Sequence, residues 1–362
     1  MHKLSVRRST VLKKNFVGKS ILSGILGAAL FASAPAQSAE QWSMATAWPG
    51  GVILEKDVGG FNQLVDTLTD GRIKITAFPG GMLGKALKVT DSVKSSVAQA
   101  GHTWMGYDWG IDKTTVLFGN MAGGLNPEEM MMWLFQAGGE QLWEEYRMKE
   151  FGVVSIACGI FPTEIFLHSN KRVQNLADFK GLKMRTAGAW AEIASGLGAS
   201  TVILPGAEVY PALERGVVDA AEWGSPSGNV PIGFHKIAKY IIMPGVHQPS
   251  ATQECQFNAD AWKRISERDR KAIRLAARLN ALESWSRYAY EDIAALDVFD
   301  KAGNEIVQLD EEFIKAANEA ADAWADKQAS ENEWFKKVLE NRRAFQKAMA
   351  QWPRFRFAMG KR

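Results

Sequence analysis

Short strand-like runs alternate with helix-like segments beyond the N-terminal segment, and this alternation constrains the fold more than any other feature of the sequence. Residues 42–47 and 73–78 alternate polar and apolar side chains as strands do. Between them, residues 58–69 carry apolar side chains at helical spacing, and an Asp-Gly pair then breaks the helix. A β-α-β start of this kind predicts an α/β fold with mostly parallel sheets.

The length of 362 residues is sufficient for two lobes, each with its own core. We expect residues 40–161 and 253–300 to form the first lobe and a lobe-spanning helix. Residues 162–252 would form the second lobe, and residues 301–362 a C-terminal helical extension. The extended pattern at 252–257 marks the return of the chain from the second lobe to the first.

The longest helix is predicted at about residues 266–299, and at about 1.5 Å per residue it could run roughly 50 Å. Spacings of four and three residues alternate along it and place seven positions in one stripe: Leu275, Leu279, Leu282, Ser286, Ala289, Ile293 and Leu296. The short, alanine-containing pattern favours packing of this stripe in the core, with a coiled-coil seam as the alternative.

The N-terminal segment has the pattern of a secretory signal peptide. Six basic residues precede an apolar run at 21–32, and Ala34-Pro35-Ala36 offers small residues for cleavage. We therefore expect residues 1–39 to be removed by a cut between 36 and 39. Arg7-Arg8 leaves twin-arginine export as an alternative to the general secretory route.

The charge of the chain changes sign when this segment is removed. The sequence has 43 basic and 40 acidic residues, a formal net charge of +3. Residues 1–39 hold six basic and no acidic residues, so the remaining 37 basic and 40 acidic residues give −3. With no basic block in the sequence, we expect no nucleic-acid partner. No later apolar run reaches the 18 residues of a membrane span, so we expect a soluble periplasmic protein.

The two cysteines are Cys158 and Cys255. A periplasm would allow them to oxidise. Cys158, however, lies in the apolar run 153–160 and has the character of a buried strand residue. We therefore expect two reduced cysteines in the core.

Arg185 lies in a context that favours an anion anchor. It ends Gly-Leu-Lys-Met-Arg at 181–185, ahead of Leu-Gly-Ala-Ser at 197–200 and a motif at 205–223 that ends in Ala-Ala-Glu-Trp. Its planar guanidinium can make two parallel charge-assisted hydrogen bonds to a carboxylate, which a lysine cannot reproduce. An isolated Lys-x-Arg would more often be a surface arginine. The order of these motifs resembles the solute receptors of tripartite ATP-independent periplasmic (TRAP) transporters, in which the matching arginine holds the substrate carboxylate.

The segment after Trp223 resembles the 2-oxoacid-binding branch of that family. It contains a glycine, phenylalanine, lysine and tyrosine series at 233–240 and Pro-Gly-Val-His-Gln-Pro at 244–249. The branch pattern is Pro-Gly-x-x-Glu-Pro, so Gln248 stands where a glutamate is expected, and Glu164 stands where a glutamine is expected. The resemblance implies a metal ion beside the substrate carboxylate, held by Glu164, Gln248 and the backbone at Trp223.

Although Glu164 and Gln248 are exchanged relative to the branch pattern, together they still supply one carboxylate and one amide oxygen. A hard cation such as Na⁺ or Ca²⁺ requires oxygen ligands and nearby negative charge. With Glu164 and Glu222 near Arg185, an approaching anion would meet excess negative charge, which a cation would offset. Alternatively, Glu164 contacts a cationic part of the ligand or pairs with Arg185 with no ion present, and Glu222 faces away.

Aromatic residues complete the predicted site. Trp104, Tyr107 and Trp109 follow a first-lobe strand, at the strand end where open α/β sheets place ligands. The resemblance implies that an aromatic side chain of this region contacts the substrate through its hydroxyl group. We therefore assign Tyr107 to substrate binding, together with Arg185, Glu164 and Trp223. Trp104 and Trp109 could equally be core residues.

Catalytic motifs do not occur in the sequence of the mature chain. It has no His-Glu-x-x-His, no phosphate-binding Gly-Lys-Ser/Thr loop, no Gly-x-Ser-x-Gly and no Cys-x-x-Cys. Its histidines lack metal-ligand spacing and are interpreted as structural: His102, His168, His235 and His247. We therefore expect a protein that is not an enzyme.

These observations predict a two-lobed periplasmic receptor that closes on a small monocarboxylate and delivers it to TRAP membrane subunits. We expect 2-oxoacids such as pyruvate as the ligands, with hydroxy or aromatic acids as the alternative. The alternative class is a periplasmic enzyme on the same scaffold, with Glu164 or Glu222 as the base. The resemblance further implies a homodimer formed through exchanged C-terminal helices, with packing of residues 311–352 on their own lobe as the alternative.

Overall fold

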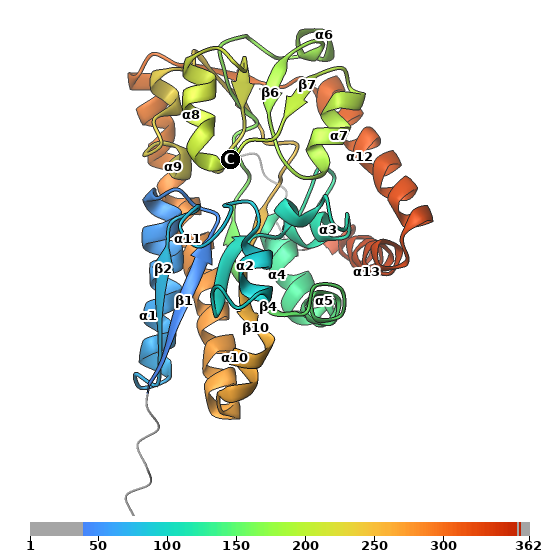
Figure 1. The fold of residues 1–362 in the computed structure, drawn as a ribbon. Helices are drawn as coiled ribbons and strands as arrows, with labels where there is room; N and C mark the ends of the chain where they lie inside the picture. Colours follow the sequence, from blue (N-terminus) through green and yellow to red (C-terminus); the bar gives the residue numbers. More distant parts are fainter. Residues whose placement is uncertain (1–38, 353–354, 356–362) are drawn as a thin grey trace, which may run out of the picture. The chain divides into compact units, whose positions relative to one another are not determined.

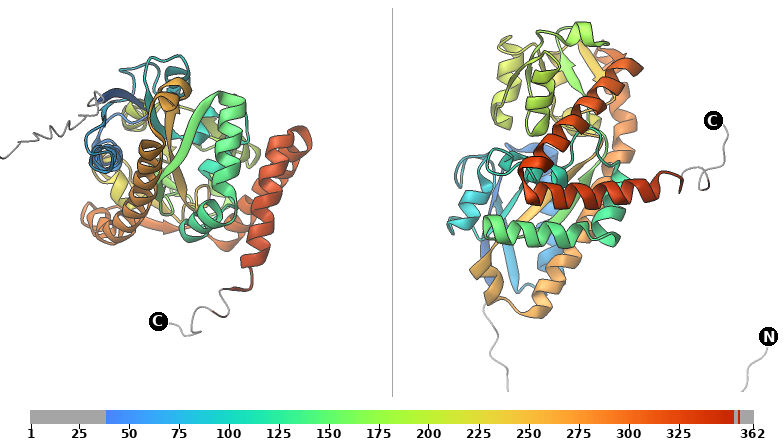
Figure 2. Two further views of the ribbon diagram at one scale, coloured as in Figure 1. Left: turned by 90° about the horizontal axis from the view of Figure 1, so that it is seen from below. Right: turned by 90° about the vertical axis from the view of Figure 1, so that its right-hand side faces the viewer.

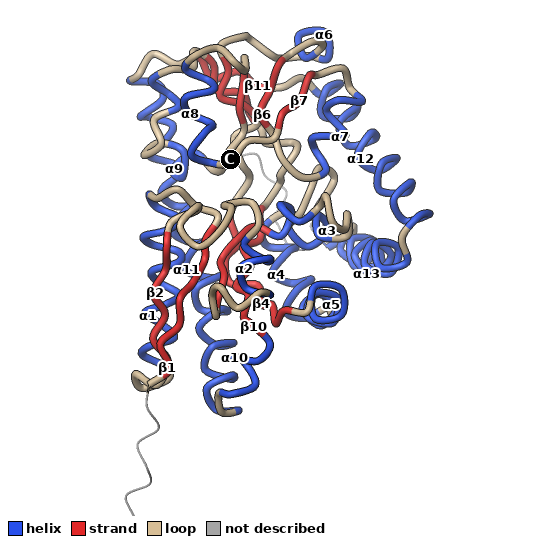
Figure 3. The backbone as a smooth tube through the Cα atoms, viewed as in Figure 1, coloured by secondary structure: helices blue, strands red, loops and turns tan. Residues whose placement is uncertain are grey.

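The computed structural model describes residues 39–352 and 355. The predicted signal peptide therefore lies outside the described residues, except for its last position. The described chain forms two β-sheets flanked by helices (Figures 1 and 3). This arrangement confirms the predicted α/β class.

The first sheet has the strand order β2-β1-β3-β10-β4. Its strands are β1 (Glu40–Thr46), β2 (Ile73–Phe78), β3 (Ala100–Trp104), β4 (Val153–Phe161) and β10 (Ala251–Asn258). Strand β1 pairs in parallel with β2 and β3, whereas β10 is antiparallel to β3 and β4. Strand β4 carries the chain toward the second sheet and β10 carries it back, so this sheet is mixed.

The second sheet has the order β11-β9-β5-β8-β6-β7. Its strands are β5 (Leu167–Ser169), β6 (Lys183–Arg185), β7 (Ser200–Val202), β8 (Ala220–Ala221), β9 (Tyr240–Met243) and β11 (Glu305–Gln308). Strand β5 is antiparallel to both of its neighbours, and the remaining pairs are parallel. Strand β11 lies in the segment 301–362, which was expected to form a C-terminal helical extension.

Some of the helices begin at residues whose side chains cap them. Asn126 forms a capping box with Glu129 at the start of α4, and Ser266 caps α11. The α-helices are α1 (Gly59–Leu68), α2 (Val89–Lys94), α3 (Thr115–Gly119), α4 (Pro127–Gln136), α5 (Gly139–Tyr146), α6 (Leu176–Phe179), α7 (Ala189–Gly196), α8 (Gly206–Glu214), α9 (Pro226–Asn229), α10 (Ala259–Arg264), α11 (Glu267–Lys301), α12 (Glu311–Glu331) and α13 (Glu333–Met349). Short 3-10 or π segments are η1 (Ile53–Val58), η2 (Met105–Asp108), η3 (Arg147–Phe151) and η4 (Phe234–Lys236). None of the helices within the described residues has both the length and the apolar character of a membrane span.

The long helix α11 is confirmed, but the face that it buries is not the predicted one. Its buried face consists largely of small or polar residues, such as Ala277 and Ala281, packed against β4. The Asn280 Nδ2 donates to the Cys158 carbonyl at 2.8 Å, and Ser284 Oγ accepts from the Ile160 amide at 3.1 Å. These short side chains allow close approach of helix and strand. The predicted core packing of the apolar stripe is wrong, because its large members are exposed: Leu275 (49%), Leu279 (41%), Leu282 (53%), Ile293 (70%) and Leu296 (37%).

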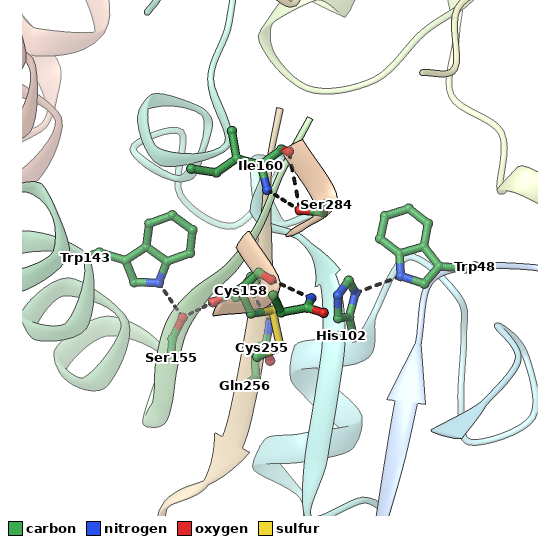
Figure 4. The surroundings of a disulfide bond; sticks show 11 residues. Trp48, His102, Trp143, Ser155, Cys158, Ile160, Cys255, Gln256 and Ser284 are labelled. Carbon is green, nitrogen blue, oxygen red and sulfur yellow. Dashed lines mark hydrogen bonds between the residues drawn. A yellow bond between two sulfur atoms is a disulfide. The ribbon is translucent and has the colours of Figure 1, made fainter. Parts of the chain in front are cut away.

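The two cysteines form a disulfide, so the expectation of reduced thiols is wrong. Cys158 and Cys255 lie 97 residues apart in the sequence, but their Cα atoms are 5.7 Å apart. The β4–β10 register shifts between Gln253 and Glu254, which leaves Cys158 as the extra residue of a β-bulge. A bulge re-aims a side chain, and Figure 4 shows the resulting bond between the two strands. This shift of register was not visible in the spacing of the cysteines.

The C-terminal helices α12 and α13 pack on their own chain. Helix α12 contacts α7, and α13 contacts α3 and α5, as the red helices in the right-hand view of Figure 2 illustrate. Phe335, Val338 and Leu339 of α13 are buried. Within this single chain, the two helices thus pack on helices from both predicted lobes, α7 in the second and α3 and α5 in the first.

Candidate ligand-binding site

A cavity of about 50 Å³ lies where side chains from both sheets and their loops meet. All five residues assigned to the site by sequence line it: Tyr107, Glu164, Arg185, Trp223 and Gln248. Trp104, Phe161 and Trp190 also contribute to its wall. The free space corresponds to roughly four water molecules. The cavity therefore has the size of a small organic acid.

Arg185 ends strand β6 and is almost completely buried. Its Nη1 donates to the Glu222 carbonyl at 3.1 Å and to the Glu222 carboxylate at 3.0 Å. Its Nε and Nη2 donate to the Leu204 carbonyl at 3.2 and 3.1 Å. Burial is the largest single influence and opposes the charge, but Glu222, Tyr107 and Glu164 together more than offset it, so the pKa of Arg185 is raised. The guanidinium is therefore charged and fixed in place.

Glu222 faces the site rather than away from it. Within the described part of the chain, its carboxylate is the one that forms an ion pair with Arg185. Glu164 instead hydrogen-bonds through Oε2 with His247 Nε2 at 3.2 Å. The direct pairing of Glu164 with Arg185, one of the sequence-based alternatives, is therefore not the arrangement in the structure.

Glu164 and His247 are a buried pair whose charged forms are both disfavoured. Burial raises the pKa of Glu164 to about 8, although the nearby Arg185 acts in the opposite direction. Burial also lowers the pKa of His247 to about 4. The sequence-based interpretation gave His247 a structural role, whereas the structure places it in the cavity wall. The sequence feature that could have indicated a site role for His247 is its position next to Gln248 in the Pro-Gly motif.

The turn that carries His247 and Gln248 packs closely against Glu164. The Glu164 amide donates to the Gln248 carbonyl at 3.2 Å. A side chain at Gly245 would place its Cβ 2.1 Å from the Glu164 carbonyl oxygen. Glycine is therefore required at position 245 because two backbone segments approach each other there.

Gln248 is held by its amide nitrogen. Nε2 donates to the carbonyls of Gly119 and Ser250, both at 2.8 Å. Because both amide protons are used in this way, Oε1 is the polar atom of the side chain that remains for a ligand or ion.

The donor atoms present fit a hard cation. Oxygen or nitrogen atoms of Glu164, Glu222 and His247 all lie within 4.8 Å of one another, and all three residues are buried. Together with Gln248 Oε1, they offer a set rich in oxygen and containing two carboxylates, which suits Na⁺ or Ca²⁺. When bound there, such a cation would offset the second carboxylate beside Arg185.

Tyr107 reaches the cavity from η2. Burial raises the pKa of its phenol, and Arg185, with which the hydroxyl interacts, acts in the opposite direction. Tyr107 is therefore a neutral hydroxyl group at the site. The neighbouring Asp108 anchors the segment, because its carboxylate receives Thr90 Oγ1 at 2.6 Å and pairs with Arg147 at 3.0 Å.

A second cavity of about 230 Å³ adjoins the first. Both cavities share Trp48, Ile53, Trp223 and Gly228 as wall residues. The wall of the second cavity is otherwise largely apolar and includes Val52, Pro231 and Ile232. Sequence reasoning did not identify this cavity, because its wall combines the turn after β1 with the segment after α9.

Comparison with known proteins identifies the family of this chain. The family described as "bacterial extracellular solute-binding protein, family 7" matches residues 44–332. A similar curated protein is the monocarboxylate 2-oxoacid-binding periplasmic protein all3028 of Nostoc sp. It is 30% identical over 320 residues, which cover 87% of this chain and 86% of the relative.

Two solved structures of TRAP solute-binding proteins are similar to this one. The first, from Bordetella bronchiseptica, has a TM-score of 0.85 and 27% identity and covers 88% of this chain and 95% of the relative. It is described as a mixed-occupancy dimer with calcium and picolinate in the occupied site. The second, from Pseudoalteromonas atlantica, contains sodium and pyruvate, with a TM-score of 0.83, 28% identity and coverage of 88% and 97%.

Proposed function

The chain belongs to family 7 of the bacterial extracellular solute-binding proteins and is a TRAP solute receptor, and we propose that it captures a small 2-oxoacid together with a cation in the periplasm. The members of the family and the structural relatives are solute-binding receptors rather than enzymes.

A single observation carries this proposal. The buried, charged Arg185 lies in the wall of a small cavity beside the carboxylates of Glu164 and Glu222. A monocarboxylate supplies one negative charge to the arginine. The 2-oxo oxygen beside that carboxylate provides a second oxygen, so the acid and the side-chain oxygens could share one cation.

The relatives support the same class of ligand. The Nostoc relative is named for its binding of monocarboxylate 2-oxoacids, and the Pseudoalteromonas structure holds pyruvate with sodium. In the Bordetella relative, an aromatic carboxylate, picolinate, occupies the site with calcium. We assign Arg185, Tyr107 and Trp223 to the substrate, Glu164 to both substrate and cation, and Gln248 and the backbone at Trp223 to the cation.

The second cavity favours 2-oxoacids with an apolar chain beyond C3. The first cavity would take the carboxylate and keto groups, and the second cavity, which shares wall residues with the first, has more than four times its volume. Burial of a methylene group there contributes about 0.8 kcal/mol. Pyruvate would leave this space unused.

Delivery to TRAP membrane subunits would follow closure of two lobes around the ligand. The lobes proposed are residues 40–161 with 253–300 and residues 162–252, followed by the extension at 301–362. We also propose that the receptor forms a homodimer, as the description of the Bordetella relative suggests.

The experiment that tests the proposed function is a thermal-shift panel on protein that has been unfolded and refolded to remove bound ligand. Pyruvate, longer 2-oxoacids, hydroxy acids and aromatic acids are each added with Na⁺, Ca²⁺ or a chelator. A ligand at one hundred times its Kd stabilises the folded state by about 2.7 kcal/mol. We expect a cation-dependent shift with 2-oxoacids. The absence of a shift with every carboxylate would overturn the proposal.

A further inference from the structure

Trp48 lies between the two cavities of the ligand-binding site. Its side chain belongs to the wall of the first cavity and also to the wall of the second. It is buried and follows strand β1, at the start of the turn that leads into η1. The position of its indole therefore affects how much room each cavity has for a ligand.

His102 holds this indole by its nitrogen. Trp48 Nε1 donates to His102 Nδ1 at 2.9 Å, and both side chains are buried (Figure 4). The two rings meet edge to face, with centroids 5.9 Å apart and planes at 71°. Burial lowers the pKa of His102 to about 3, so the imidazole is neutral. Because an indole N–H can only donate, Nδ1 is the unprotonated nitrogen and the proton of the ring is on Nε2.

The first sheet fixes the place of the His102 ring. In strand β3, His102 lies opposite Thr46 of β1 and Cys255 of β10. One ring nitrogen is within 4.8 Å of the sulfur atoms of both Cys158 and Cys255. Figure 4 shows the imidazole between the disulfide and Trp48. The ring therefore links a rigid part of the sheet to the wall of the ligand site.

The second nitrogen of the ring indicates why a histidine occupies this position. His102 Nε2 is buried and has no hydrogen-bond partner within the described residues. A buried donor without a partner lowers the stability of the fold. An aliphatic side chain of similar size would fill the same space without this cost. What the histidine adds is the acceptor for the Trp48 indole.

We propose that His102 is a positioning residue for ligand specificity, which holds the Trp48 indole against the sheet and keeps the second cavity open to the chain of the ligand. Without the acceptor, the indole N–H would be buried and unpaired, so the ring would turn toward free space. The second cavity has about 230 Å³ and the first about 50 Å³, so the turned ring would take its room from the second. This inference rests on the proposed function, in which the second cavity receives the part of a 2-oxoacid beyond C3.

The first test compares three substitutions of His102. His102→Leu removes the acceptor, whereas His102→Asn retains one, because its Oδ1 stands at the level of Nδ1. His102→Gln carries its amide one bond further from the backbone, at the level of Nε2. We expect His102→Leu and His102→Gln to lower the affinity for a long-chain 2-oxoacid by about tenfold relative to pyruvate, as when a pocket loses room for a methylene group. His102→Asn should retain the wild-type ratio.

Competition calorimetry with the two ligands measures this ratio, and urea denaturation is measured for each variant. A general loss of stability reduces the amount of folded protein but does not change the ratio of the two affinities. The matched control is His235→Leu, which removes a histidine that lines neither cavity. It should keep the wild-type ratio even if its stability decreases.

A double variant shows whether His102 acts through Trp48. Phenylalanine has no N–H group, so Trp48→Phe removes the hydrogen bond from the other side. If His102 acts only by holding Trp48, then adding His102→Leu to Trp48→Phe should not change the ratio further. A further change in Trp48→Phe/His102→Leu would show that His102 acts by another route and would overturn the proposal.

The second test needs no ligand and is carried out by NMR on protein labelled with ¹⁵N in the tryptophan and histidine side chains. We expect a neutral His102 with its proton on Nε2 and a hydrogen-bonded indole signal from Trp48. That indole signal should move in His102→Leu and return in His102→Asn, and Trp48→Phe assigns it. This measurement remains available on the wild-type protein if a substituted chain does not fold.

The outcomes separate this inference from the proposed function. A proton on His102 Nδ1, a wild-type ratio in His102→Leu, or a ratio that His102→Asn does not restore overturns the role of His102. If the wild-type protein binds no 2-oxoacid while the NMR signals are as expected, the proposed function fails. The positioning of Trp48 by His102 then stands, and its effect on the choice of 2-oxoacid is refuted.

Discussion

Arg185 donates its Nη1 to the Glu222 carboxylate across 3.0 Å while both residues remain buried. The receptor therefore contains an ion pair at the point where we propose that a substrate carboxylate binds. Glu222 fixes the orientation of the guanidinium, and it also reduces the net positive charge available to an anion. This relationship explains why a cation beside Glu164 and Glu222 would strengthen the binding of an anionic ligand.

Replacement of Arg185 by lysine should weaken binding of every carboxylate by at least about 100-fold. A lysine has three donors and no planar fork, so it cannot keep the bonds of Arg185 to Glu222 and Leu204 and also bind the ligand, and each charge-assisted bond contributes about 1.5–3 kcal/mol. Isothermal titration calorimetry with a 2-oxoacid measures the change. Arg215→Lys, at an exposed arginine after α8, is the control and should bind normally. Near-native affinity of Arg185→Lys would show that Arg185 is not the anchor.

Gln248→Glu should lower both the stability of the fold and the affinity for the ligand, although the 2-oxoacid-binding branch of the TRAP receptors has a glutamate at this position. The substitution places a carboxylate against the Gly119 and Ser250 carbonyls, which now receive the Gln248 amide protons. The loss of these bonds should cost about 2 kcal/mol in the free energy of unfolding. Glu164→Gln/Gln248→Glu, which restores the branch order, should not recover the affinity. Full recovery would mean that the two positions are interchangeable.

Gly245→Ala should reduce ligand affinity by about tenfold or more. The added Cβ would meet the Glu164 carbonyl oxygen at 2.1 Å, so Glu164 would have to move. Displacement of the Glu164 carboxylate would also weaken the dependence of binding on Na⁺ or Ca²⁺ in the thermal-shift assay. Gly196→Ala, where the added Cβ meets no atom within 4 Å, should bind as wild type does. An unaltered cation dependence in Gly245→Ala would contradict this account.

His168 should make the protein less stable as the pH falls from about 6.5. Burial lowers the pKa of His168 to about 3, whereas an unfolded histidine titrates near 6.5. Between these values the unfolded state binds the extra proton, so the stability from His168 is complete above pH 6.5 and decreases as the pH approaches 3. Between these two pKa values, each pH unit of acidification lowers the free energy of unfolding by about 1.4 kcal/mol.

Urea denaturation at several pH values between 7 and 4.5 tests this prediction. His168→Gln, whose side-chain oxygen can still accept from Asn229, should show a shallower decrease of stability in acid than the wild type. The comparison isolates His168 from the carboxyl groups that titrate in the same range. Equal slopes for the two proteins would refute the assignment.

Filling the second cavity should change the ratio of the affinities for long-chain 2-oxoacids and for pyruvate. Ile232 lines that cavity but not the first, so Ile232→Phe should weaken binding of branched or long-chain 2-oxoacids by about tenfold and leave pyruvate nearly unaffected. Competition calorimetry with both ligands measures the ratio. Val217→Phe, at an exposed position, should not alter it. An equal loss for pyruvate would indicate that the cavity does not receive the chain of the ligand.

Much of the site could be predicted from the sequence because its chemistry lies in local motifs. Arg185 ends a strand that its own residues predict, and Tyr107 follows a strand of the first sheet. Both line the cavity, as do Glu164 and Gln248. The role of His247 was missed because its significance depends on Glu164, which lies 83 residues earlier and hydrogen-bonds with it.

The sequence by itself determined which residues share a strand, a helix or a helix face, because periodicity is a local property of the backbone. It determined the long helix and its apolar stripe, and it located the anion anchor. Only the tertiary structure decided that the stripe faces outward, because the small residues and Asn280 on the other face fit β4 more closely. It also decided that Cys158 meets Cys255, 97 residues later in the sequence, through a bulge between β4 and β10. Such contacts depend on the surface that each element meets, and this surface is assembled only when distant segments pack together.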